Sequence, residues 1–160
     1  MRTMRLFWLE LRRLLQSRLT WLIVLLTVLS PLVGLTLYRP ATASTMLTQY
    51  LANPAIAGGA VGGVLFGILT IFELDRPSRS RVEALTDAAV SPLTMALVRL
   101  AALITSAVLA LLVVMAVWFP ISWGMIGQVF DAADYLLSYL LLTGLALPLG
   151  ILAAGAAYQF

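Results

Sequence analysis

The stretch FELDRPSRSRVEALTDAAVSPLTMALVRL, Phe72–Leu100, is the long polar interruption between two strongly apolar segments of a 160-residue chain. Residues 73–87 of this stretch hold seven charged residues: Glu73, Asp75, Arg76, Arg79, Arg81, Glu83 and Asp87. Across the whole chain 62% of residues are hydrophobic, 11% are charged and the mean hydropathy is +1.02. A water-soluble domain does not have this composition. The sequence therefore predicts an all-α integral membrane protein in which this stretch is a loop outside the bilayer.

The composition also excludes several kinds of chemistry. Histidine and cysteine are absent, and all ten basic residues are arginines. Disulfides, thiolate chemistry and the usual transition-metal sites are therefore excluded, and we expect no catalytic residue, no metal and no cofactor. The net charge of +3 comes from a few arginines that flank apolar segments. A nucleic-acid partner is not expected from this pattern.

Residues 1–18 are predicted to form an amphipathic helix on the membrane surface. At 100° per residue, one face carries Met4, Phe7, Trp8, Leu11, Leu14 and Leu15, and the opposite face carries Arg2, Arg5, Arg12, Arg13 and Gln16. The apolar face would rest at the acyl boundary and the arginines at anionic headgroups of membrane lipids. The alternative is a solvated, positively charged leader.

Four later segments are predicted to cross the membrane as one helix bundle, forming a single transmembrane domain over 1–160. They are residues 19–37, 55–72, 100–119 and 135–157, each long enough at about 1.5 Å per residue to cross a hydrocarbon core of about 30 Å. Pro31 should kink the first span. An aromatic belt should close the third span at the water boundary, with residues 121–129 along the interface; its members are Trp118, Phe119, Pro120 and Trp123. Asp131 and Asp134 should cap the fourth.

Gly59, Gly63 and Gly67 recur every four residues and form a nearly flat face on the second span. Small residues allow close packing between helices in lipid, where the hydrophobic effect does not drive their association. Packing against another span is the favoured interpretation, and a path for substrate is the alternative.

The arginines predict the orientation of the chain. Nine of the ten lie before the first span or between the second and third: Arg2, Arg5, Arg12, Arg13, Arg18, Arg76, Arg79, Arg81 and Arg99. Because arginines in short loops remain cytoplasmic, the N-terminus and the 73–99 loop are placed there, and Arg39 lies outside. No charged residue lies within the predicted spans, which argues against a proton relay or an ion-pair pathway.

The loop itself has recognisable helix signals. Ser80 and Glu83 match a capping box that would start a short amphipathic helix over residues 81–89. Ser91 and Pro92 then supply an N-cap and a first helical residue for the third span. Glu73 and Asp75 are either solvated charges or partners of Arg76 or Arg79.

With these features, the chain resembles the membrane (permease) subunit of ABC-2 type ABC transporters. The resemblance lies in the order of helices, in Glu73 at the end of the second span, in Glu83-Ala84-Leu85 and in Arg99. Members show G-T-x-E-x-L and then P-[VI]-S in this loop. Here Ser80-Arg81 replaces the glycine-threonine pair, and Ser91-Pro92 reverses the order of the second motif.

The resemblance implies a coupling helix at 81–89 that binds a separate ATP-hydrolysing subunit. The contact residues would be Arg81, Val82, Glu83, Leu85, Thr86 and Ala89. It also implies pairing with a second permease subunit, as a homodimer or heterodimer, in the plasma (inner) membrane of a prokaryote. Such permeases usually have six spans, so the four predicted here suggest a fragment or a divergent short form. An apolar end without a positive anchor favours the fragment.

Three function classes remain open. The first is this ATP-driven permease, expected to be an exporter. The second is a small membrane scaffold or assembly subunit without transport activity. In that case Val82, Leu85 and Ala89 would pack on the protein's own helices or on lipid. The third, an intramembrane enzyme, lacks a base at depth, since no histidine or lysine accompanies Ser30, Ser106 or Ser138.

Overall fold

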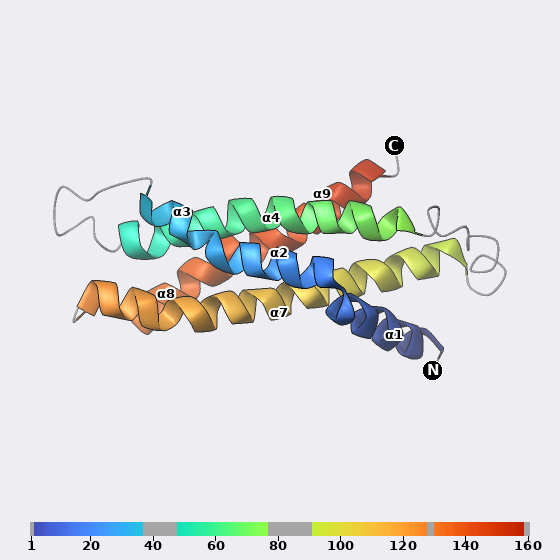
Figure 1. Cartoon of the computed structure of the whole chain (residues 1–160), viewed down its shortest axis with the longest axis horizontal. Coiled ribbons are helices and arrows are strands. Elements are labelled where there is room, and N and C mark those ends of the chain that lie inside the picture. Colours follow the sequence, from blue (N-terminus) through green and yellow to red (C-terminus); the bar gives the residue numbers. More distant parts are fainter. Residues whose placement is uncertain (1, 37–47, 77–90, 128–129, 159–160) are drawn as a thin grey trace.

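The computed structural model describes residues 2–36, 48–76, 91–127 and 130–158, and all secondary structure within these ranges is helical (Figure 1). Four of its helical segments are long and apolar enough to cross a membrane: Arg18–Thr36, Tyr50–Leu74, Leu93–Ile126 and Ala132–Tyr158. The predicted all-α class and the four segments of membrane-spanning length are therefore confirmed.

The elements are α1 (Arg2–Gln16), α2 (Arg18–Leu29), α3 (Pro31–Thr36), the π-helical turn η2 (Thr48–Ala52), α4 (Asn53–Leu74), α7 (Pro92–Ile126), α8 (Ala132–Ser138), the π-helical turn η4 (Tyr139–Thr143) and α9 (Gly144–Tyr158). The spans lie along the long axis of the molecule, which is horizontal in Figure 1, and successive spans run in opposite directions. We call the end where α4 stops and α7 begins the charged end. The opposite end, where α7 stops and α8 begins, is the aromatic end.

Pro31 divides the first span into α2 and α3 without unwinding it. Ser30, between the two helices, keeps right-handed helical angles (φ −61°, ψ −31°), and its N–H donates to the Leu26 carbonyl over 2.9 Å. A proline ring crowds the preceding turn, so the helix bends where the N–H of residue 31 is missing. The two halves still form one segment of 19 residues.

The helix that contains the third predicted span is longer than the span itself. Instead of ending at Phe119, α7 continues through Pro120 to Ile126 and is 35 residues long. Residues 121–126, expected to lie along the interface, therefore extend the same helix. Pro120 costs one backbone hydrogen bond, which helices in membrane proteins tolerate when neighbouring groups compensate.

Small residues bring α4 and α9 close together. A Cβ atom added at Gly63 would lie 2.9 Å from the Ala146 carbonyl oxygen, and one at Gly59 would lie 2.7 Å from the Leu142 carbonyl oxygen. Gly67 follows on the same face, where an added Cβ atom would lie 3.3 Å from the carbonyl oxygen of Gly150. The glycine face of the second span thus lies against the backbone of the fourth span.

Three side-chain hydrogen bonds link different helices near the aromatic end. The Trp118 indole N–H donates to the Val28 carbonyl over 2.8 Å, and the Tyr135 hydroxyl donates to the Met115 carbonyl over 2.7 Å. The Thr143 hydroxyl donates to a backbone carbonyl of α4 over 2.8 Å. Trp118 is only 2% exposed, so it packs inside the bundle and is not a member of a surface belt. These bonds satisfy polar groups that an apolar environment would otherwise penalise.

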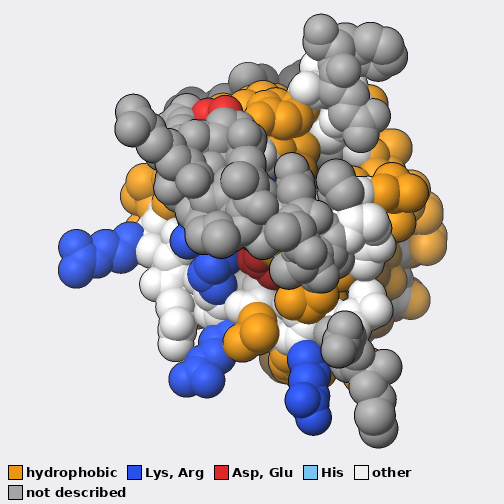
Figure 2. Space-filling view, turned by 90° about the vertical axis from the view of Figure 1, so that its right-hand side faces the viewer, with side chains coloured by type: hydrophobic (Ala, Val, Ile, Leu, Met, Phe, Trp, Pro, Cys, Tyr) orange, Lys and Arg blue, Asp and Glu red, His pale blue; other side chains and the backbone are white. Residues whose placement is uncertain are grey.

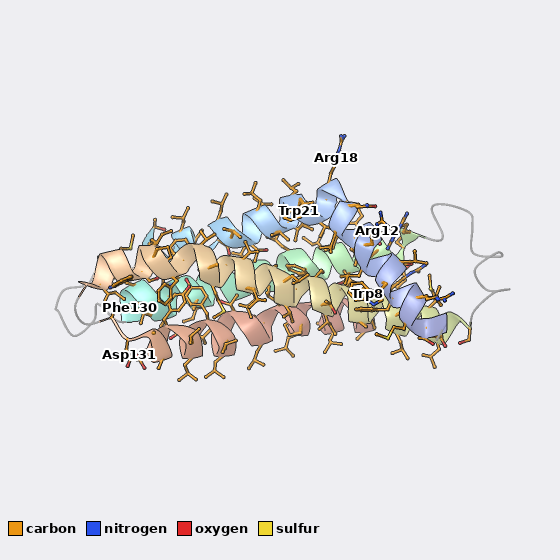
Figure 3. The ribbon with its side chains drawn as sticks, turned by 90° about the horizontal axis from the view of Figure 1, so that it is seen from below. Trp8, Arg12, Arg18, Trp21, Phe130 and Asp131 are labelled. Atoms are coloured by element: carbon orange, nitrogen blue, oxygen red, sulfur yellow. The ribbon has the colours of Figure 1, made fainter. Side chains whose placement is uncertain are left out.

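Helix α1 leaves the bundle axis and crosses the charged end obliquely (Figure 3). It packs mainly on α7. Leu11 and Leu14 are 5% and 2% exposed and belong to the main apolar core, which also contains Leu103 of α7. Met4 and Trp8, predicted on the same apolar face, are instead 68% and 59% exposed. The apolar face of α1 is therefore shared between the bundle and the surroundings.

Candidate functional site

Of the two helices that flank residues 77–90, α4 stops and α7 begins at the charged end. The chain leaves α4 after Leu74, and the N–H of Asp75 still donates to the Ile71 carbonyl over 3.0 Å. It re-enters the bundle at Ser91, the N-cap of α7, whose hydroxyl oxygen accepts from the Thr94 N–H over 3.4 Å. Pro92 is the first residue of that helix. We call the end of α4 and the start of α7 the loop stems.

The corner between α1 and α2 is fixed by backbone and side-chain contacts. Ser17 is extended (φ −75°, ψ 128°), which ends α1 and lets α2 start at Arg18 in a new direction. The Trp21 indole N–H donates to the Leu15 carbonyl over 2.7 Å, occupying one of the carbonyls that a helix end leaves free. Figure 3 shows Arg18 pointing away from the bundle at this corner.

Four charged side chains from three helices meet at the charged end, and we call them the charge cluster: Glu10 and Arg13 of α1, Glu73 of α4 and Arg99 of α7. Arg13 donates a hydrogen bond from Nη2 to Glu73 Oε2. The same Nη2 forms an ion pair with Glu10 Oε2 at 2.6 Å. Arg99 Nε lies 3.8 Å from Glu10 Oε1, which is an ion pair at the long limit.

The charge cluster is partly withdrawn from water. Its side chains are 11% (Glu73), 12% (Glu10), 15% (Arg99) and 28% (Arg13) exposed. Two carboxylates and two guanidinium groups leave no formal net charge, which is a condition for burying ions at tolerable cost. The buried Nε–H groups of Arg13 and Arg99 donate no hydrogen bond, and the buried Oε2 of Glu10 accepts none, within the described part of the chain. The cluster is therefore neutral but incompletely hydrogen-bonded.

The charged end also carries exposed arginines. Figure 2 looks onto it and shows basic side chains spread over the described surface, with an acidic side chain recessed between them. Arg5, Arg12 and Arg18 are among the exposed residues of α1 and α2. Lys and Arg side chains at such positions favour contact with anionic surfaces.

The structure corrects the interpretation of Glu73. The sequence left it as a solvated charge or a partner of Arg76 or Arg79. Glu73 is buried and binds Arg13, sixty positions earlier, so it is not a solvated charge, while Arg79 lies outside the described residues. The reason is that α1 folds along α7 and places its Arg13 side next to the end of α4. A signal for this was present, because Glu10 is the one acidic residue among the first eighteen, within a run of arginines.

An open apolar groove lies between the first turns of α1 and α7. It measures about 540 Å³ and is lined by Thr3, Met4, Phe7, Thr94, Leu97, Val98 and Ala101. A smaller cavity of about 50 Å³ lies between α2 and α7, where Thr20 and Ser106 are its polar members. Both have mainly apolar walls.

The predicted site residues are only partly placed by the structure. The predicted coupling helix and its cap lie outside the described residues: Ser80, Arg81, Val82, Glu83, Leu85, Thr86 and Ala89. Ser91 and Pro92 begin α7, and the three glycines face α9, away from the loop stems. Among the described residues, carboxylates do not gather in a group that could hold a metal ion.

Comparison with known proteins gives no further assignment. No family model, curated protein or solved structure matches the chain.

Proposed function

We propose that the chain is a permease subunit of an ATP-driven transporter of the ABC-2 type, and that it exports substrate across the plasma (inner) membrane of a prokaryote. A separate partner subunit hydrolyses ATP, and a second permease subunit completes the membrane part. In this arrangement the N-terminus and residues 77–90 face the cytoplasm, α1 lies at the inner membrane surface, and residues 81–89 form the coupling helix.

The observation that carries the proposal is the meeting of both loop stems and α1 at one charged end. Nine of ten arginines flank these elements in sequence, and the spans contain no charged residue at depth. Energy for transport would therefore have to enter from outside the bilayer. A polar loop held between two spanning helices is suited to pass on the movement of a cytoplasmic partner.

The test is copurification with an ATP-hydrolysing subunit from the native membrane. The change Leu85→Asp places a charge on the predicted apolar face of the coupling helix, so we expect loss of the ATPase from the purified complex with normal membrane insertion. Leu93→Asp is the matched control, because Leu93 is 70% exposed at the start of α7 and lies outside the coupling helix. Retention of the ATPase by Leu85→Asp would reject the coupling assignment.

A membrane scaffold or assembly subunit is the second candidate. It is favoured by the mainly apolar walls of the groove and the cavity, which offer few polar groups to a polar substrate. The permease proposal accounts for these walls by placing the path between two subunits. Copurification separates the two candidates, since a scaffold would not bring down an ATPase in a fixed ratio.

A further inference from the structure

We infer that Arg13 is a clasp between the two loop stems. Helix α1 packs on α7, where the loop ends, and its Arg13 binds Glu73 in the last turn of α4, where the loop begins. Any effect of this clasp on the binding of an ATPase subunit rests on the proposed function. The clasp itself is a property of the chain alone.

The contacts of α1 with α7 and with α4 are of different kinds. With α7 it shares apolar packing, in which Leu11 and Leu14 are buried. With α4, among the described residues, it shares the ion pair from Arg13 to Glu73. An apolar contact area holds a helix without fixing its partner's end, while a charge-assisted hydrogen bond fixes two atoms. Arg13 therefore joins the end of α4 to α1, in addition to the packing of α4 on α2, α7 and α9.

The cluster is suited to being opened. Glu10 and Glu73 both contact the same Nη2 of Arg13, and Arg99 stays 3.8 Å from Glu10. If Arg13 left Glu73, it would keep Glu10 as a partner, so its charge would not be stranded. The Glu73 carboxylate would be the group left unpaired, and removal of one partner from a buried pair is the unfavourable step. The closed clasp is thus the preferred state, and the loop stems separate when it opens.

A distance measurement between spin labels tests the clasp without any partner. The chain has no native cysteine, so labels can be placed at Ile71→Cys on α4 and Leu93→Cys on α7, which are 46% and 70% exposed. In lipid nanodiscs we expect one narrow distance distribution for the otherwise unchanged chain. Arg13→Glu should broaden it towards longer distances, because three carboxylates would then share the site.

The charge exchange is the decisive variant. Arg13→Glu combined with Glu73→Arg restores opposite charges across the gap, so the narrow distribution should return. Arg12→Glu is the matched control, since it makes the same charge change on an exposed neighbour. If Arg13→Glu does not fold, Glu73→Gln removes the ion pair with little change of shape and should also broaden the distribution.

Each result decides the inference. A distribution that stays narrow in the folded Arg13→Glu or Glu73→Gln variant would overturn the clasp, as would equal broadening by Arg12→Glu. If the clasp variants broaden the distribution as expected while no ATPase ever copurifies with the unchanged chain, the clasp stands and the proposed function fails. If an ATPase copurifies but the distances do not respond, the proposed function stands and the clasp fails.

Discussion

Gly63 has no room for a side chain at the contact between α4 and α9. A Cβ atom there would lie 2.9 Å from the Ala146 carbonyl oxygen, which belongs to the backbone and cannot rotate away. We expect Gly63→Ala to force the helices apart and to lower the free energy of unfolding by about 1–3 kcal/mol, the usual cost of overpacking. Thermal unfolding in detergent, followed by circular dichroism, measures the change.

Gly124→Ala is the control for this substitution, because a Cβ atom at Gly124 would meet no atom within 4 Å. It should leave the unfolding temperature unchanged or raise it slightly, since alanine favours the helix. Equal melting of both variants and the unchanged chain would show that α4 and α9 do not pack through Gly63.

At this scale the sequence predicts some contacts and not others, for a physical reason. The four-residue spacing of Gly59, Gly63 and Gly67 defines a face on one helix, but a face does not name its partner. Ion pairs between distant residues are harder still. Arg13 has several arginine neighbours that look equivalent in sequence, and only the path of α1 along α7 brings it, and not Arg12, to Glu73.

Helix α1 is the element whose environment can be measured most directly. Trp8 is 59% exposed, whereas Trp118 of α7 is 2% exposed. If α1 lies at the membrane surface, Trp8 should contact lipid chains directly. We expect a variant that keeps Trp8 as its single tryptophan to be strongly quenched by lipids brominated on their acyl chains, and a variant that keeps only Trp118 to be quenched weakly.

A water-soluble quencher supplies the opposite outcome. If iodide quenches Trp8 efficiently and brominated lipids do not, α1 lies in water, and the solvated-leader alternative replaces the interfacial helix. The variant that keeps only Trp118 serves as the reference in both experiments, because the burial of Trp118 within the bundle should protect it from either quencher.

The residues at which the helices begin and end were predicted less well than the presence of the helices. Ser91 and Pro92 mark the start of α7 because a cap and a proline are local chemistry. The sequence ended the third span at Phe119 because proline favours a stop, whereas the helix itself continues to Ile126. In this chain α7 continues past Pro120, and just before the proline the Trp118 indole N–H donates to the Val28 carbonyl of α2.

For the whole molecule, the number of spans followed from hydropathy, while the arrangement of the spans did not. Long apolar segments must form helices in lipid because the backbone has no water to bond with. Hydropathy carries no information on which helices touch. The pairing of α4 with α9 and the burial of the charge cluster depend on shape and on the oblique path of α1. The sequence therefore predicted at which end of the bundle the candidate site lies. It did not predict the ion pair between Arg13 and Glu73.

The orientation of the whole molecule decides whether any cytoplasmic partner can reach the loop stems. Asp134→Cys places a thiol at the exposed start of the fourth span, and Leu93→Cys places one at the start of α7. Because the chain has no other thiol, a membrane-impermeant maleimide should label only the introduced cysteine. We expect Asp134→Cys to react in intact cells and Leu93→Cys to react only after permeabilisation, because the positions of nine arginines predict that the charged end faces the cytoplasm. The reverse pattern would put residues 77–90 outside the cell, where no ATP is hydrolysed by a cytoplasmic subunit. It would therefore reject the permease proposal while leaving the Arg13 clasp open to its own test.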